Sequence, residues 1–329
     1  MNKSKQKEKL LKLSIRIDWR IFAPALVIIA GICWGLIGLF SNYLSAAGLR
    51  PEQITVVRCV LACVVIGAYL LVFKRGAFKV RIKHLWIFLG TGVLSIAFYN
   101  ICYFACINMC GLSFAAILLY TAPCFVVLLS AVFFKERLTR QRGFALVIAF
   151  VGCLLVVGVG SGQASLSGLG ILVGLASGIG YALYSIFARV ALKHYEAPTV
   201  MFYTFLFASL ALLPFSDPIG IASLALNSPS VFEVMVALAL ISTVTPFACY
   251  TTGLAHMETG KASIMAFVEP MVSLLLGVMV FGEVVTLQNM IGVVGIIIAV
   301  ALLNLPENAL HKFISKKSGK VRKFAGVKH

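Results

Sequence analysis

The chain reads FKERLTRQ at residues 134–141 and FGEVVTLQ at residues 281–288. The two segments start 147 positions apart and share Phe, Glu, Thr and Gln at the same places. At this offset Pro123 also matches Pro270, and Tyr103 matches Tyr250. Apolar helices match one another by chance, but polar residues and prolines at one fixed offset indicate an internal duplication.

The composition around these segments is typical of a polytopic membrane protein and excludes a soluble enzyme. Hydrophobic residues make up 61% of the 329 residues and charged residues 12%, against about 45–50% and 25% in soluble domains. Ten apolar segments approach the ~20 residues that cross a bilayer. We expect them at 22–44, 53–73, 85–107, 112–134, 143–160, 169–190, 198–215, 233–254, 261–281 and 289–304.

Basic residues predict the orientation of these spans. Of the 28 Lys and Arg, 26 fall in the two tails and in alternate gaps between the spans. The positive-inside rule therefore predicts a multi-pass protein of the cytoplasmic membrane with both termini in the cytoplasm. The basic residues do not form a stripe with interleaved aromatics, so we expect anionic lipids at the tails rather than nucleic acid as the counter-charge.

The duplication divides the chain into two repeats of opposite orientation. We expect a basic tail at 1–21, repeats at 22–160 and 169–304, and a basic tail at 305–329. Each repeat holds five spans, an odd number, so the second repeat must cross the membrane in the opposite direction. The predicted fold class is an all-α membrane protein of ten helices in two inverted five-helix repeats. Such symmetry suits a site near the midplane that opens alternately to either side.

Several motifs carry a resemblance to a known family, and they follow one another in order. They are Trp34-Gly35, Pro51 followed by RCVLA at 58–62, and the two blocks from Pro123 to Thr139 and from Glu269 to Thr286. The pattern resembles the EamA-like family of the drug/metabolite transporter superfamily. The resemblance implies a ten-helix secondary transporter for amino acids, nucleobases, amines or related metabolites, often moved outward. Family members often carry a Lys late in the first span, where this chain has Ser41 and Asn42.

We therefore expect a secondary-active exporter that works by alternating access, as a monomer or a homodimer, with a proton as a possible coupling ion. An uptake permease for a choline-like amine is the alternative, and a membrane-embedded enzyme or a channel is disfavoured. No cofactor is expected, because the sequence lacks a zinc-ligand cluster and a complete phosphate-binding loop.

Two charged residues fall inside predicted spans, away from the span ends. Glu269 lies in the ninth span, where a carboxylate is costly unless it is paired, neutralised or hydrated. It is a candidate proton carrier or counter-ion for an amine, and the alternative is a neutral or paired side chain that caps backbone freed by Pro270. Arg58, in the second span, is a candidate partner for a substrate carboxylate, or a structural residue that reaches the interface. Glu136 and Glu283 are expected to cap or gate helix ends.

Prolines and aromatic residues mark the expected cavity. Pro123 and Pro270 interrupt matching helices, which favours a nearby substrate site, while Pro246 is expected to add a break with no counterpart, since Tyr99 holds the equivalent place. Aromatic faces attract organic cations and planar substrates, although single Tyr and Trp residues also serve packing. The candidate lining is Trp34, Tyr99, Asn100, Tyr103, Tyr120, Tyr181, Tyr184 and Tyr250, together with Glu269.

Overall fold

The computed structural model describes residues 18–158 and 167–305. Within this part of the chain, ten helical segments are long and apolar enough to cross a membrane. They are Trp19–Ala46, Pro51–Phe73, Ile82–Cys110, Leu112–Phe134, Arg140–Val157, Gly168–Ala191, Ala197–Phe215, Pro229–His256, Thr259–Phe281 and Leu287–Asn304. They confirm the ten predicted spans, and no end differs by more than four residues. The predicted tails lie outside the described residues, apart from 18–21 and 305.

Three of the spans are interrupted near their middle. The first divides into α2 (Trp19–Gly35) and α3 (Ile37–Ala46). The fourth divides into α7 (Leu112–Leu119) and α8 (Ala122–Phe134), and the ninth into α15 (Thr259–Met265) and α16 (Val268–Phe281). The last two breaks fall just before Pro123 and Pro270, as predicted, because proline cannot donate the amide hydrogen that would continue the helix.

Two further spans contain π-helical segments at equivalent positions. They are η3 (Gly90–Ala97), which precedes Tyr99, and η5 (Leu240–Val244), which precedes Pro246. The expectation that the break at Pro246 has no counterpart is therefore wrong. In the first repeat the irregularity arises through packing rather than proline. Gly92 in η3 lies so close to α11 that a Cβ there would come within 2.6 Å of the Thr204 carbonyl oxygen.

The remaining helices complete the two repeats. They are α4 (Pro51–Phe73), α5 (Leu85–Leu89), α6 (Phe98–Cys110), α9 (Arg140–Val157), α10 (Gly168–Ala191), α11 (Ala197–Leu212), α12 (Pro218–Asn227), α13 (Pro229–Ala239), α14 (Thr245–His256) and α17 (Leu287–Asn304), with short 3-10 turns at η1 (Arg75–Phe78), η2 (Ile82–His84) and η4 (Leu213–Phe215).

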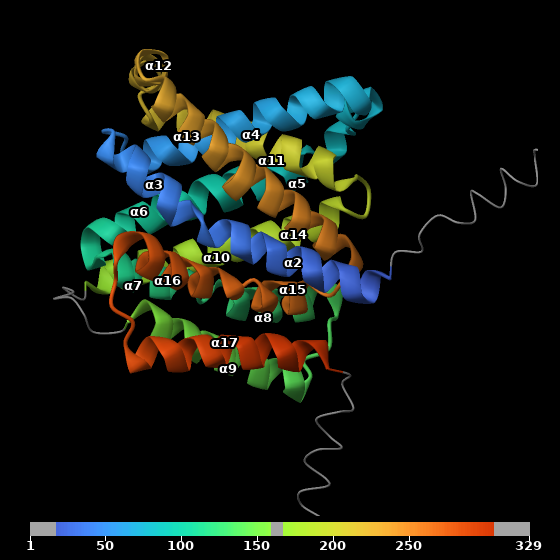
Figure 1. Cartoon of the computed structure of the whole chain (residues 1–329). Coiled ribbons are helices and arrows are strands. Elements are labelled where there is room, and N and C mark those ends of the chain that lie inside the picture. Colours follow the sequence, from blue (N-terminus) through green and yellow to red (C-terminus); the bar gives the residue numbers. More distant parts are fainter. Residues whose placement is uncertain (1–17, 159–166, 306–329) are drawn as a thin grey trace, which may run out of the picture.

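Contacts between the repeats are related by a pseudo-two-fold axis. Helix α9 packs on its equivalent α17 along one edge of the bundle (Figure 1), and α4 packs on its equivalent α11. The contact of α2 with α14 is repeated by that of α10 with α6. The fold is therefore an all-α bundle of two inverted five-helix repeats, as predicted.

The two ends of this bundle are named here by the chain termini. The tail end holds the starts of α2, α9 and α15 and the end of α17, next to the described termini at Asp18 and Leu305. The far end holds the starts of α4, α7 and α17, together with the ends of α3, α6 and α16.

Candidate functional site

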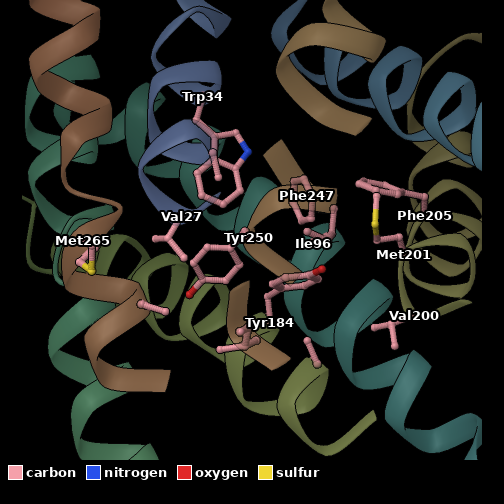
Figure 2. Packing of buried hydrophobic residues seen from close by; sticks show 14 of the residues in the cluster. Val27, Trp34, Ile96, Tyr184, Val200, Met201, Phe205, Phe247, Tyr250 and Met265 are labelled. Carbon is pink, nitrogen blue, oxygen red and sulfur yellow. The ribbon is translucent and has the colours of Figure 1, made fainter. Parts of the chain in front are cut away.

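Aromatic side chains from both repeats meet at the centre of the bundle. The Trp34 ring of α2 lies 5.5 Å from the Phe247 ring and 5.4 Å from the Tyr250 ring, both on α14. Tyr184 of α10 meets Phe247 edge to face at 5.0 Å. Figure 2 shows these four rings converging from three helices.

The tyrosine hydroxyls in this group are held by neighbouring side chains. Tyr184 shares a hydrogen bond of 2.6 Å with the Thr251 hydroxyl, and Tyr250 shares one of 2.8 Å with the Ser185 hydroxyl. Each bond joins α10 to α14. Buried hydroxyls require partners, and these bonds fix the orientation of both rings.

A cavity of about 500 Å³ extends from the aromatic group toward the far end of the bundle. A volume of this size suits a small metabolite. Ser45 and Pro51 line its outer part, and Glu269 and Trp34 its inner part. A narrower compartment of about 50 Å³ continues from it between α10, α14 and α16.

Arg58 is held in the cavity wall by the other repeat. Its Nε donates to the Thr243 hydroxyl over 3.0 Å, and its Nη2 donates to the Ser242 carbonyl oxygen over 3.5 Å. Both acceptors lie in the π-helical segment η5. A guanidinium carries five N–H donors, so donors not used in these two bonds are available to a ligand in the cavity.

Glu269 lies in the first turn of α16, directly after the helix break. A carboxylate there interacts favourably with the positive end of the helix dipole. Its neighbours are the Tyr120 hydroxyl and, at longer range, the Arg58 guanidinium. Within the described residues no ion pair joins Glu269 to Arg58. The cavity therefore presents a carboxyl group and a guanidinium group that do not form a direct ion pair within the described residues.

Close packing of α2 on α16 sets the position of Glu269. A Cβ on Gly35 would come within 2.6 Å of the Val272 Cβ and 2.9 Å of the Glu269 carbonyl oxygen. The Ser273 hydroxyl donates to the Gly35 carbonyl oxygen over 3.3 Å. Since only glycine fits at this crossing, Gly35 allows α16, which carries Glu269, to lie directly against the first span.

The structure places most of the predicted site residues around the cavity or its narrow continuation. Those that line the cavity or its narrow continuation are Trp34, Arg58, Tyr99, Asn100, Tyr103, Tyr120, Pro123, Tyr181, Tyr184, Tyr250 and Glu269. Pro246 and Pro270 are not among the described lining residues, and they shape the helix backbone instead. Asn100 is buried, and its amide group donates to the Ile96 carbonyl oxygen over 2.7 Å.

Sequence reasoning missed Phe247 and Phe267, which also line the cavity. Phe247 had a usable signal, because it follows Pro246 and matches Asn100 at the repeat offset. Phe267 had a signal of the same kind, because it matches Tyr120, a predicted lining residue, at the repeat offset. It lies in the break between α15 and α16 and faces Tyr120, with a ring separation of 6.2 Å.

The tail end of the bundle is closed beneath the cavity. The Glu136 carboxylate accepts hydrogen bonds from the backbone amides of Thr259 at 2.7 Å and Gly260 at 3.0 Å. Arg142 lies 4.0 Å from Glu136 and pairs with Glu258 as well. The Glu136 and Arg142 side chains are only 9% and 8% exposed. These contacts join the loop after α8 to the start of α15.

Comparisons with known proteins agree with this architecture. A solved crystal structure superposes with a TM-score of 0.72 at 18% identity, covering 85% of this chain and 95% of that one. An uncharacterized transporter of Archaeoglobus fulgidus is 30% identical over 204 residues, 61% of this chain and 71% of the relative. A probable amino-acid metabolite efflux pump of Salmonella typhimurium is 25% identical over 226 residues, 64% of this chain and 73% of the relative.

The model of the EamA-like transporter family matches residues 21–158 and again residues 168–305. Its members and these relatives are transporters rather than enzymes, and the apolar helices identify a multi-pass membrane protein. A transporter of this kind carries a small-molecule substrate. With both repeats matched, the chain belongs to the EamA-like transporter family.

Proposed function

We propose that the protein is a secondary-active exporter of a small zwitterionic metabolite of the amino-acid type. The observation that carries this proposal is the pairing of Arg58 and Glu269 in one aromatic cavity without a direct ion pair between them in the described structure. A molecule with one carboxylate and one ammonium group supplies both missing counter-charges.

The energetic argument rests on the cost of charges inside a membrane. An isolated charged side chain within the hydrocarbon costs several kcal/mol, which water or a partner must offset. In the open cavity water hydrates Arg58 and Glu269. When the cavity closes, that water leaves, and a zwitterion satisfies both groups at once. An amine alone or a carboxylate alone leaves one charge unmatched and is disfavoured.

The aromatic walls add affinity for the remainder of such a substrate. Tyr99 and Tyr181 meet edge to face at 5.2 Å beside Glu269 in the lining. Aromatic faces attract an ammonium group and provide apolar contact for a side chain. A nucleobase uses the aromatic surfaces but leaves the two charges unmatched, and a choline-like amine uses only Glu269.

The charge pattern and the chemistry of the site support a direction and an energy source. Basic residues concentrate at the tail end, so we place that end in the cytoplasm. The cavity then faces outward, and this state is the release state of an exporter. Entry of a proton at Glu269 competes with the substrate ammonium for the same carboxylate, which couples efflux to the proton gradient. The similarity to the Salmonella typhimurium relative, which is named a probable amino-acid metabolite efflux pump, supports export.

The proposed assembly and partners are simple. Both repeats lie in one chain, so a monomer contains a complete site, and a homodimer would repeat it. Anionic lipids are proposed partners for the basic tails, whose residues lie outside the described structure apart from 18–21 and 305.

Thermal stabilisation of the purified protein tests the substrate class. A ligand that binds the folded state raises its stability by mass action, by about 2.7 kcal/mol at a hundredfold excess over Kd. The panel comprises free amino acids, their N-acetyl and carboxamide derivatives, choline and adenine. We expect stabilisation by free amino acids and none by derivatives that lack one charge. Stabilisation by choline or adenine but by no amino acid would contradict the proposal.

A further inference from the structure

The two copies of the repeated loop have the same backbone. Lys135 and Gly282 occupy the left-handed region at φ 57° and 67°. The Glu136 amide donates to the Ser130 carbonyl oxygen over 3.4 Å, and the Glu283 amide donates to the Gly277 carbonyl oxygen over 3.0 Å. Each pair is related by the offset of 147. The loops therefore present their glutamates from equivalent positions at opposite ends of the bundle.

The two carboxylates nevertheless have different surroundings. Glu136 is buried against the start of α15, where it accepts two backbone hydrogen bonds. Glu283 is exposed, and its carboxylate lies over Gly277 on the preceding helix, α16. Within residues 18–158 and 167–305 no hydrogen bond or ion pair to the Glu283 side chain is present.

The offset identifies the helix start that Glu283 would reach. Thr259 and Gly260, which Glu136 holds, match Leu112 and Ser113 at the start of α7. Thr259 and Gly260 are buried, whereas Leu112 and Ser113 are exposed. Helix α15 packs along α8, but the equivalent pair, α7 and α16, makes hardly any contact. Leu112 lines the cavity on the side where it opens.

We infer that Glu283 is a positioning residue that closes the far end of the transporter. In the alternate state α16 lies against α7, and the Glu283 carboxylate accepts hydrogen bonds from the amides of Leu112 and Ser113. Glu136 then releases α15, and the tail end opens. The two states are similar in energy at these loops, because in each state one glutamate carboxylate accepts hydrogen bonds from the amides at one helix start. This inference rests on the alternating access proposed above.

Residues beside the two loops shift the equilibrium between the two conformations toward the observed one. Arg142 reinforces Glu136 and also pairs with Glu258, the residue before α15. At the equivalent positions the far end has Asn289 and Gly111. The Asn289 amide group donates to the Val156 carbonyl oxygen over 2.9 Å, on a different helix. The closed tail end therefore has an ion pair that the closed far end lacks.

Hydrogen–deuterium exchange of the full chain in lipid nanodiscs tests this assignment. Amides held in hydrogen bonds exchange slowly, at a rate set by local opening. In the unmodified protein we expect slow exchange at 259–262 and fast exchange at 112–115. Glu136→Ala should speed exchange at 259–262 and slow it at 112–115, each on the order of tenfold for loss or gain of a charged hydrogen bond.

The double variant Glu136→Ala with Glu283→Ala distinguishes binding of the start of α7 by Glu283 from a general loosening of the bundle. It should lose the protection that Glu136→Ala gains at 112–115. Glu233→Ala, at an exposed acid on α13, is the matched control and should change neither segment. Glu136→Gln replaces the alanine variant if that one fails to fold, with smaller shifts of the same sign.

Two results would overturn the inference. One is unchanged exchange at 112–115 in Glu136→Ala, and the other is protection there that persists in the double variant. Neither result bears on the substrate site, since ligand stabilisation through Arg58 and Glu269 is measured separately. Loss of that stabilisation with the exchange pattern intact would instead reject the proposed substrate class.

Discussion

The guanidinium of Arg58 in the first repeat donates from Nε to the hydroxyl of Thr243 in the second repeat, 3.0 Å away. The bond crosses the interface between the repeats at the cavity wall, and its acceptor lies in a π-helical segment. The orientation of the cationic group of one repeat therefore depends on a backbone irregularity of the other.

Thr243→Val tests this dependence. Valine keeps the shape and removes the acceptor, so Arg58 should lose its fixed orientation. A hydrogen bond to a charged group contributes about 1.5–3 kcal/mol, and we expect amino-acid affinity to fall about tenfold or more. Calorimetric titration gives the affinity. Thr199→Val is the control, because that hydroxyl bonds to the Ala77 carbonyl oxygen outside the cavity. Equal loss in both variants would contradict a specific role for Thr243.

Much of the fold was predictable because its determinants are local or periodic. The apolar segments set the spans, since each must satisfy its backbone within the membrane. The breaks before Pro123 and Pro270 followed from proline chemistry. The pairing of equivalent helices such as α9 and α17 followed from the duplication, because inverted repeats impose a pseudo-two-fold axis.

Features that depend on packing were not predictable. The break at Leu36 has no proline in the sequence and lies where Gly35 meets α16. The π-helical segment at Gly90–Ala97 is likewise set by contact with another helix. Such features follow from which surfaces meet in three dimensions, and a single sequence does not record this.

Alanine substitutions at two glycines in the first span test the close crossing of α2 and α16. Gly35→Ala should lower the melting temperature, because its Cβ would meet Val272 and the Glu269 carbonyl oxygen. Overpacking of this kind costs about 1–3 kcal/mol. Gly38→Ala is the matched control, since a Cβ there would meet no described atom within 4 Å outside the backbone of its own helix and its chain neighbours. A melting temperature unchanged in Gly35→Ala would show that the helices are not in close contact.

Glu269→Gln tests the anionic half of the site by a reversal of preference. The variant keeps the shape but loses the charge that pairs with an ammonium group. Affinity for a free amino acid should fall at least tenfold, and affinity for its N-acetyl derivative should rise, because Arg58 still binds the carboxylate. Titration of both ligands against both proteins provides the comparison. A parallel loss for both ligands would point to a structural role for Glu269.

Phe247→Ala tests the aromatic centre of the bundle. The ring contacts Trp34, Tyr184 and Phe205. Removal of a buried Phe side chain typically costs about 3–5 kcal/mol, so we expect a clear fall in melting temperature and weaker ligand binding. Phe133→Ala, at a ring that is 64% exposed, is the control and should have little effect. Similar losses in both variants would argue against a special role for the central group.

Counterflow in proteoliposomes tests whether the protein carries amino acids by alternating access. Vesicles loaded with an unlabelled amino acid are diluted into a trace of the same labelled compound, and a carrier that alternates access accumulates the label transiently. We predict accumulation by the unmodified protein and none by the double variant Arg58→Gln with Glu269→Gln, which has two neutral groups in the cavity. Equal accumulation by the double variant, or accumulation of choline but of no amino acid, would contradict the account.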